Sequence, residues 1–195
     1  MESVEYNLDL FEAMLDEIED FLLSADIFWP LAKRSKPGSP PYPRLSTGGL
    51  LMTQDESLAQ ETEMNSDQKA QHAKLQIQWK RILNRWRSAL GRKSEREMGM
   101  RLNLWRAYLS DLEEGNASHF DYHRETRNRA QFTRLRTLAA SSSKTLKMGK
   151  TVRSLDARLL NLTIASDFIW DDRLRETYPE REFSFLYRQP RENGK

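Results

Sequence analysis

Hydrophobic residues recur every three or four positions along most of the chain, a spacing that predicts α-helices. The first segment shows it most clearly, with one face formed by Leu8, Phe11, Leu15, Ile18 and Leu22. Acidic residues occupy the opposite face, so the pattern predicts an amphipathic helix over about residues 6–24. Exposing its apolar face to water would cost free energy, and we therefore expect this helix to pack against the basic helices that follow.

Residues suited to helix caps divide the middle of the chain into further helices. Ser46 or Thr47 can begin a second helix, and Asn65 or Ser66 can begin a third that runs toward Leu90. A fourth helix follows, with an apolar stripe formed by Met98, Leu102, Trp105, Leu109 and Leu112. The spacing thus predicts consecutive helices from about residue 46 to residue 114.

The boundary between the third and fourth helices admits two arrangements. Gly91 suits the C-terminal cap of a helix, and Ser94 with Glu97 has the spacing of a capping box. These signals predict a helical hairpin, with a kinked continuous helix as the alternative.

Arg101 falls inside the apolar stripe of the fourth helix. We expect its guanidinium to reach the surface or to meet a carboxylate of the acidic first helix. The carboxylates considered for that pairing are Glu12, Asp16 and Glu19.

Two tryptophans lie in the basic stretch QWKRILNRWR. On a helix, Trp79 and Trp86 share the face of the leucines, whereas Lys80 and Arg85 point to the other side. A groove that stacks nucleic-acid bases would interleave aromatic and basic side chains, and this helix separates them. We therefore predict that Trp79, Trp86 and Trp105 are buried together in the core.

The second half of the chain alternates weak and strong helical patterns. A fifth helix, near residues 121–140, has a narrow apolar stripe interrupted by charges. The stretch SSSKTLKMGK after it has the composition of a mobile loop. A sixth helix then carries Val152, Leu155, Leu159 and Leu162 at helical spacing.

Two segments depart from the helical pattern. Four prolines lie among residues 33–43, which predicts a proline-rich linker over residues 33–44. Near the end, Phe183, Phe185 and Tyr187 alternate with period two, which predicts a short extended segment. The fold expected is all-α, an irregular bundle of about six helices in a single domain over residues 1–195. Its parts are the acidic helix (1–32), the linker (33–44), the helical core (45–165) and the aromatic C-terminal segment (166–195).

Composition excludes several kinds of chemistry. The 195 residues include no cysteine, which rules out disulfides and thiolate sites and suits a reducing compartment. The N-terminus is acidic, unlike a secretory leader, and no apolar run approaches the roughly 20 residues of a membrane-spanning helix. We expect a cytoplasmic protein without membrane contact. The pair His119 and His123 has helical spacing but no further ligand, so neither a metal nor a cofactor is expected.

Acidic and basic residues are concentrated in different segments of the chain, and the functional hypotheses are based on this separation. The segment before Lys33 has nine acids and no Lys or Arg, whereas residues 124–153 hold nine basic residues and one acid. No arrangement of nucleophile, base or paired carboxylates is recognisable, so we expect no enzymatic activity. The leading hypothesis is an adaptor with a protein partner, a subunit of a larger assembly. It would act through charged helical faces and the C-terminal aromatics Phe183, Phe185 and Tyr187.

The alternative hypothesis is a nucleic-acid-binding accessory protein. Its phosphate contacts would come from the fifth helix and the loop after it. The residues expected to form that surface, or an equivalent surface for an acidic partner, are Arg124, Arg127, Arg129, Arg134, Lys144, Lys147 and Lys150.

Overall fold

A computed structural model describes residues 1–117 and 119–191, except for the side chains of residues 119 and 120. Over this part of the chain 68% of the structure is helical and 4% is strand, which confirms the all-α prediction. The α-helices are α1 (Val4–Asp16), α2 (Ile18–Leu23), α3 (Thr47–Ala59), α4 (Ser66–Arg85), α5 (Arg87–Glu113), α6 (His119–Leu135), α7 (Ser143–Leu162) and α8 (Glu180–Phe183). Two short strands, β1 (Thr163–Ala165) and β2 (Arg188–Pro190), pair antiparallel.

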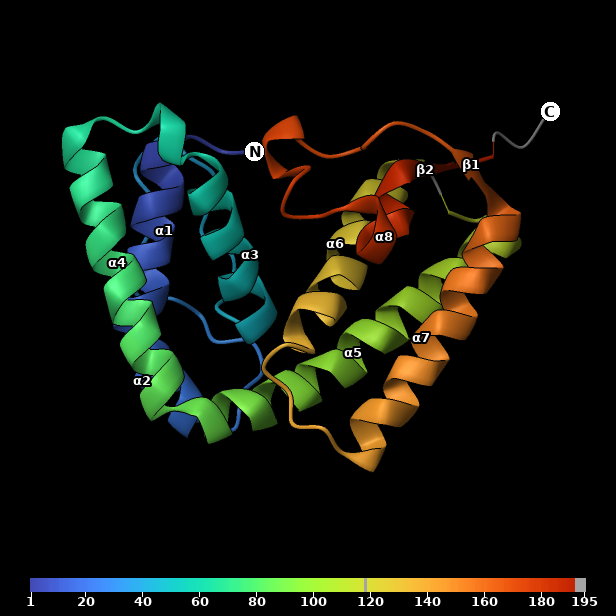
Figure 1. Ribbon diagram of the computed structural model, residues 1–195, viewed down its shortest axis with the longest axis horizontal. Helices are drawn as coiled ribbons and strands as arrows, with labels where there is room; N and C mark the ends of the chain where they lie inside the picture. Colours follow the sequence, from blue (N-terminus) through green and yellow to red (C-terminus); the bar gives the residue numbers. More distant parts are fainter. Residues whose placement is uncertain (118, 192–195) are drawn as a thin grey trace.

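The helices form two groups joined by α5 (Figure 1). On one side α1, α3 and α4 lie side by side, with α2 below them. On the other side α6 and α7 pack on α5, and the C-terminal segment returns over them. The groups meet where α3 contacts both α5 and α6, and one continuous hydrophobic core runs through the molecule.

The acidic N-terminal helix packs within the chain, as its pattern predicts. Leu8, Phe11, Leu15, Ile18 and Leu22 are all buried, although the helix breaks at Glu17 into α1 and α2. The sequence did not reveal how its charges are neutralised. Lys36 pairs with Glu5 and Asp9, and Lys33 pairs with Glu12, at 2.5–2.8 Å. The proline-rich segment therefore neutralises most of α1, and it does so by folding back along that helix.

Two further contacts hold the proline-rich segment in place. Its ends meet where Trp29 and Leu45 form an antiparallel bridge. Near its middle, the ring of Tyr42 packs edge-on against Tyr6, with 5.4 Å between the ring centroids. The segment is thus a closed loop on the surface of α1 that brings Leu45 back beside the start of α3.

The structure has neither the hairpin nor the kink predicted at Gly91, and the break between the two helices lies five residues earlier, at Trp86. The chain bends there and then continues as α5 straight through Gly91 to Glu113. A Cβ atom at Gly91 would lie 3.3 Å from the carbonyl oxygen of Leu138. The glycine therefore permits close packing against the chain after α6 and does not end a helix.

The loop predicted over residues 141–150 is also wrong for most of its length. α7 begins at Ser143, because Ser142 and Thr145 cap its first turn reciprocally in a capping box. Met148 then turns into the core. A serine-rich composition favours a loop only where these hydroxyls do not cap a helix.

The C-terminal aromatics lie on helical turns, in place of the extended backbone that their spacing predicts, and the two phenylalanines are buried. Phe183 ends α8, Phe185 and Tyr187 lie in a 3-10 turn, and only Arg188–Pro190 is extended. Phe183 packs edge-on against Tyr178 at 4.9 Å, and Phe185 lies 6.1 Å from Trp105. Tight turns let both phenylalanines reach the core, whereas on a strand they would share one flat face.

Trp79 and Trp105 are buried in the same continuous core, as predicted, but they lie in different groups of helices. Trp79 donates its indole N–H to Gln54 of α3, and Trp105 packs against Tyr108 in the other group of helices. Trp86 is half-buried at the kink, where its indole N–H reaches Glu19. The bend at Trp86 separates residues that a straight helical pattern would align.

A buried histidine between α3 and α4 makes stability depend on pH. His72 lies beside Ser57 and Gln76, and burial lowers its pKa from the ordinary value of 6.5. The unfolded chain therefore binds a proton on this residue at a higher pH than the folded chain, so stability is full above pH 6.5 and falls as the pH drops below it.

Replacing His72 should reduce the loss of folding stability at acidic pH. We expect His72→Gln, which keeps a hydrogen-bonding side chain, to flatten the fall of the urea midpoint between about pH 6.5 and pH 5. The exposed His123→Gln is the control and should behave as the wild type. An unchanged slope in His72→Gln would show that other groups set the acid sensitivity.

Candidate functional site

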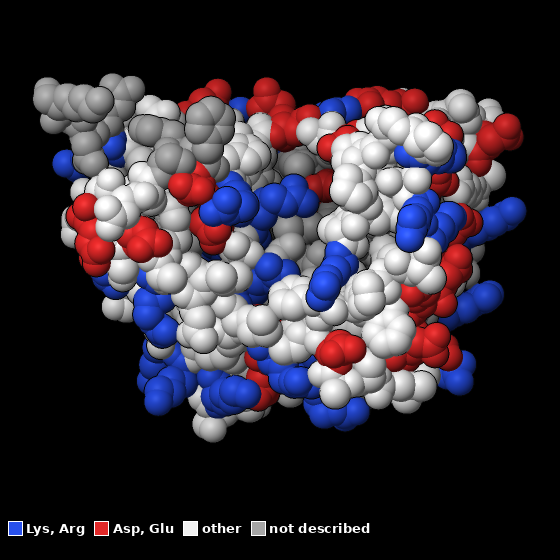
Figure 2. Space-filling model, turned by 180° about the vertical axis from the view of Figure 1, so that it is seen from behind, with Lys and Arg blue, Asp and Glu red and all other residues white. Residues whose placement is uncertain are grey.

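A cleft of about 690 Å³ lies between the two groups of helices. Figure 2 looks onto this face, where Lys and Arg side chains surround a hollow at its centre. One wall is α1 with the residues before it, the floor is the start of α3 with α5, and the opposite wall is α6. The lining includes Tyr6, Asn7, Leu10, Met14, Phe28, Pro43, Arg44, Ser46, Thr53, Glu56, Arg101, Arg124, Glu125, Arg127, Asn128 and Gln131. Its volume is in the range of ligand-binding clefts, roughly 300–1,000 Å³.

A buried carboxylate organises the floor of the cleft. Glu97 of α5 accepts hydrogen bonds from Ser46 Oγ and from the backbone N–H of Gly48, both at 2.9 Å. These donors belong to the first turn of α3, where the helix dipole favours a negative charge. A Cβ atom at Gly48 would lie 2.8 Å from Glu97 Oε1, so this contact requires a glycine.

The same carboxylate satisfies Arg101. Glu97 Oε1 accepts from Arg101 Nε at 3.1 Å and from Nη2 at 2.8 Å, while Nη1 donates to Asn128 Oδ1 at 2.6 Å. The expectation of a partner from the first helix is wrong. The partner lies one turn earlier on the same helix, a spacing that the sequence shows and that favours such pairs. The guanidinium also lies 5.1 Å from the ring of Phe28.

Hydrogen bonds continue from Arg101 to the outer wall. Asn128 Nδ2 donates to Glu125 Oε2 at 2.8 Å, and Glu125 Oε1 accepts from Arg124 Nε at 3.1 Å. Beside them Arg127 pairs with Glu56 of α3, also at 3.1 Å. The polar side chains of α6 are therefore held in fixed positions by α3 and α5.

Some polar groups at the rim of the cleft and below it have no partner within the protein or keep exposed surface. Arg44 is exposed, and no described carboxylate pairs with it. Arg124 and Arg127 keep 70% and 47% of their side chains exposed. Below the rim, Asn7 Oδ1 and Gln131 Oε1 are buried without a hydrogen-bond partner. The cleft thus presents guanidinium groups outward and unused acceptors inside.

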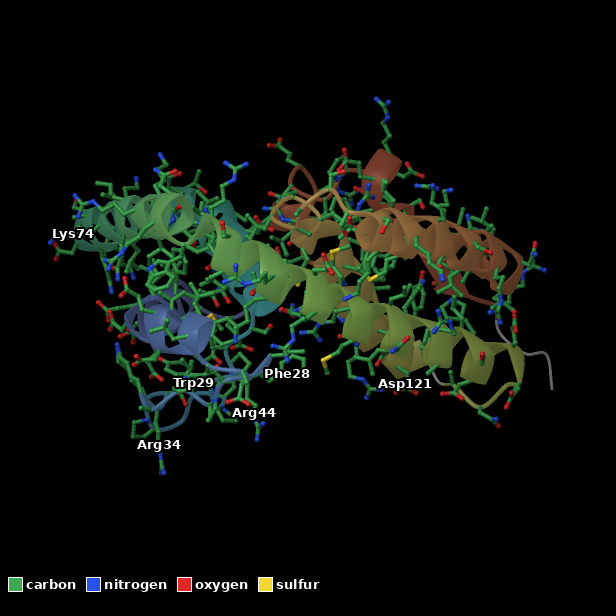
Figure 3. The ribbon with its side chains drawn as sticks, turned by 90° about the horizontal axis from the view of Figure 1, so that it is seen from below. Phe28, Trp29, Arg34, Arg44, Lys74 and Asp121 are labelled. Carbon is green, nitrogen blue, oxygen red and sulfur yellow. The ribbon has the colours of Figure 1, made fainter. Side chains whose placement is uncertain are left out.

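Figure 3 shows how the proline-rich segment supplies the rim. Arg44 lies beside Phe28, both next to the helices that form the cleft. Arg34 projects outward from the other end of the same segment. One segment therefore carries an exposed arginine at the cleft and another away from it.

Three carboxylates line the cleft: Glu2, Glu56 and Glu125. Glu56 pairs with Arg127 and Glu125 pairs with Arg124, at 3.1 Å in each case. No histidine is among the lining residues. Within the described part of the chain no three acidic or histidine side chains gather as a metal site requires. The side chain of His119, expected to lie near His123, is outside the described residues.

The basic residues singled out in the sequence do not form one surface. Arg129 must be withdrawn as a phosphate contact, because its side chain is 7% exposed and pairs with Asp156 through two hydrogen bonds. Arg134 pairs with the buried Asp55, and Lys144 pairs with Glu95. Arg124 and Arg127 belong to the cleft. Only Lys147 and Lys150 are exposed without a described ion pair. The concentration of basic residues in the sequence did not reveal that several of them pair with carboxylates far away along the chain.

The aromatic docking segment needs a similar correction. Phe183 and Phe185 are 2% and 1% exposed and belong to the core, so neither is available to a partner in this conformation. Tyr187 is half-buried, and its hydroxyl donates to the carbonyl oxygen of Tyr178. The segment closes the core, and the exposed surfaces available to partners lie elsewhere.

Comparison of the chain with protein-family models, curated proteins and solved structures gives no match. Function is therefore inferred from the geometry of the molecule itself. One general property is visible in it: none of the described helices has the length and apolar character needed to cross a membrane.

Proposed function

We propose that this protein is a non-enzymatic binding protein, an adaptor whose central cleft receives an acidic segment of a protein partner. The observation that carries the proposal is the set of exposed guanidinium groups at the rim, Arg44, Arg124 and Arg127, above a floor of fixed polar groups. They come from two parts of the chain that the fold brings to one opening.

The chemistry of the lining favours a carboxylate ligand. A guanidinium has five N–H donors in a planar fork that matches a carboxylate. Arg124 uses Nε for Glu125 and Nη2 for Asp121, so further N–H groups remain for a ligand. The existing pairs also restrict the rotamers of these arginines, which lowers the entropy lost when a ligand binds.

A peptide fits the cleft better than an isolated anion. Phe28 is half-buried and Pro43 is exposed, and both line the same space and offer apolar contacts beside the cations. Asn7 and Gln131 also line it, and their side-chain oxygens are buried without a hydrogen-bond partner. A rotation of these amides into the cleft would let them accept from backbone N–H groups of an extended chain. Acidic side chains and backbone amides together describe an acidic peptide segment.

Arg44 and Arg34 provide a matched test, since both are exposed arginines without a described ion pair in the same segment. We expect peptides selected by phage display on the wild-type protein to be rich in Asp and Glu. In fluorescence anisotropy, Arg44→Glu should weaken binding of a selected peptide about tenfold, roughly 1.4 kcal/mol, because it puts a like charge at the rim. Arg34→Glu should bind as the wild type. Selected peptides without acidic residues, or equal losses in both variants, would contradict the proposal.

A further inference from the structure

A second basic surface lies away from the cleft, where the start of α5, the end of α6 and the start of α7 meet (Figure 1). Figure 2 shows Lys and Arg side chains along the lower margin of the molecule, where these segments lie. All six cations of this basic patch are exposed, and no described carboxylate pairs with any of them: Arg92, Arg96, Arg136, Lys147, Lys150 and Arg153.

Contacts between the helices place these residues together. Glu95, between Arg92 and Arg96 in α5, pairs with Lys144 at 3.1 Å and accepts from Ser142 Oγ at 3.3 Å. The two arginines therefore flank the N-terminal turn of α7. Between the end of α6 and the first turns of α7, a groove of about 200 Å³ is lined by Arg136, Lys150 and Arg153 and by no carboxylate.

The charge of the patch is unbalanced within the chain itself. Arg92 and Arg96 are four residues apart on one helix, and Lys147, Lys150 and Arg153 follow one another at three-residue steps. Like charges at these spacings repel, and the acid between the two arginines, Glu95, is already paired with Lys144. A bound polyanion would remove that cost and release the counterions that otherwise screen the patch.

We propose that the basic patch binds the phosphate backbone of nucleic acid. A protein partner fits it less well, because the centre of a protein interface is depleted of charge and the patch has one exposed large apolar side chain, Leu146. The groove contains no aromatic, Asn or Gln side chain, the types that stack on bases or read their edges. Binding is therefore independent of base sequence.

This second function does not rest on the cleft. Of the seven residues that the sequence suggested, it retains Lys147 and Lys150 and adds the four arginines of the patch. The two surfaces also differ in kind, since the cleft combines arginines with apolar and amide groups and the patch has little besides cations.

The test uses labelled single-stranded and duplex oligonucleotides of several sequences across a salt series. For duplex DNA the slope of log K against log salt is about −0.9 per phosphate neutralised, so four or five contacts give a slope of about −4. Lys147→Glu/Lys150→Glu should weaken binding to all sequences alike and flatten the slope by about 2.

The matched control is Lys74→Glu/Lys80→Glu, which makes the same change of charge on two exposed lysines of α4. Neither lysine has a described ion pair, and Figure 3 shows Lys74 at the far end of the molecule. The control should keep the wild-type slope. If the α7 variant does not fold, as judged by circular dichroism, Arg92→Glu/Arg96→Glu takes its place.

Three results would overturn the proposal. The first is the absence of a salt-sensitive complex at low ionic strength. The second is an equal loss in patch and control variants, because overall charge would then explain the binding. The third is a complex with polyglutamate that depends on Lys147 and Lys150 without a complex with any oligonucleotide, which would make the patch a surface for acidic proteins.

Discussion

Asp156→Ala destabilises the protein by about 3–5 kcal/mol, the loss expected when one partner of a buried ion pair is removed. Asp156 of α7 accepts from Arg129 Nε at 2.9 Å and from Nη2 at 2.6 Å. The guanidinium is nearly inaccessible and lies 4.7 Å from the ring of Phe185 in the core. Without Asp156 it would remain buried and charged with no carboxylate beside it. The measurement is the free energy of unfolding from urea titrations of both proteins.

The control is a different ion pair, which joins α5 to α7. Arg158 and Glu113 also form two hydrogen bonds, but both side chains are well exposed. Solvent screens such pairs, so Glu113→Ala should change stability little. In addition, Arg129→Met/Asp156→Leu should recover much of the loss, because apolar residues can replace a buried pair. Equal effects of Asp156→Ala and Glu113→Ala would show that burial does not set the contribution of the Arg129 pair.

Trp105→Ala lowers the free energy of unfolding by about 3–5 kcal/mol, a loss typical of deleting a large buried aromatic side chain. Trp105 is fully buried, with Tyr108 stacked at 5.7 Å and Phe185 at 6.1 Å. Its indole N–H donates to Asp156 Oδ1 at 3.3 Å, so the substitution also removes a hydrogen bond from the Arg129 pair. The C-terminal segment loses the contact of Phe185 with this ring at the same time.

The neighbouring Leu104→Ala is a control on the same turn of α5, since Leu104 is 44% exposed and its loss leaves no internal cavity. Its effect on the urea midpoint should be small. A Trp105→Ala protein as stable as Leu104→Ala would mean that the C-terminal segment does not cover α5 in solution. The double variant Trp105→Ala/Asp156→Ala should show less than the summed loss, because the two side chains contact each other.

The two proposals assign different ligands to surfaces of similar charge. At the cleft, arginines stand beside apolar side chains and unused amide oxygens, which suits a peptide. At the basic patch, the Lys and Arg side chains have no described carboxylate partner and no aromatic or amide side chain in the groove beside them, which suits a phosphate backbone. Arg44→Glu and Lys147→Glu/Lys150→Glu should therefore have separate effects, the first on peptide binding and the second on oligonucleotide binding.

Local pattern was sufficient to predict the helices and most of the core. The stripe of α1, the caps Ser46 and Asn65, and the apolar face of α7 are all as predicted, because helical periodicity and capping depend on residues three or four positions apart. The same local rules were misleading at Gly91 and at residues 143–150. A glycine in close contact and a glycine cap look alike in sequence, as do capping serines and loop serines.

The cleft could be predicted only in part. Glu97 lies one turn before Arg101, so this pair could have been recognised from spacing alone. The remaining contacts of the floor join Ser46 and Gly48 to α5 and Asn128 of α6 to Arg101, across separations of 27 to 51 residues. Periodicity carries no information on which helices meet at those distances.

By itself, the sequence determined an all-α chain, its helical faces, the burial of the N-terminal helix and the concentration of basic residues in residues 124–153. The tertiary structure decided which of those basic residues remain available for a ligand. Arg129 and Arg134 are neutralised by Asp156 and Asp55, while Lys147 and Lys150 are not. The physical reason is that a helical face follows from neighbours along the chain, whereas the charge it presents depends on which distant carboxylates the packing of helices brings within about 4 Å.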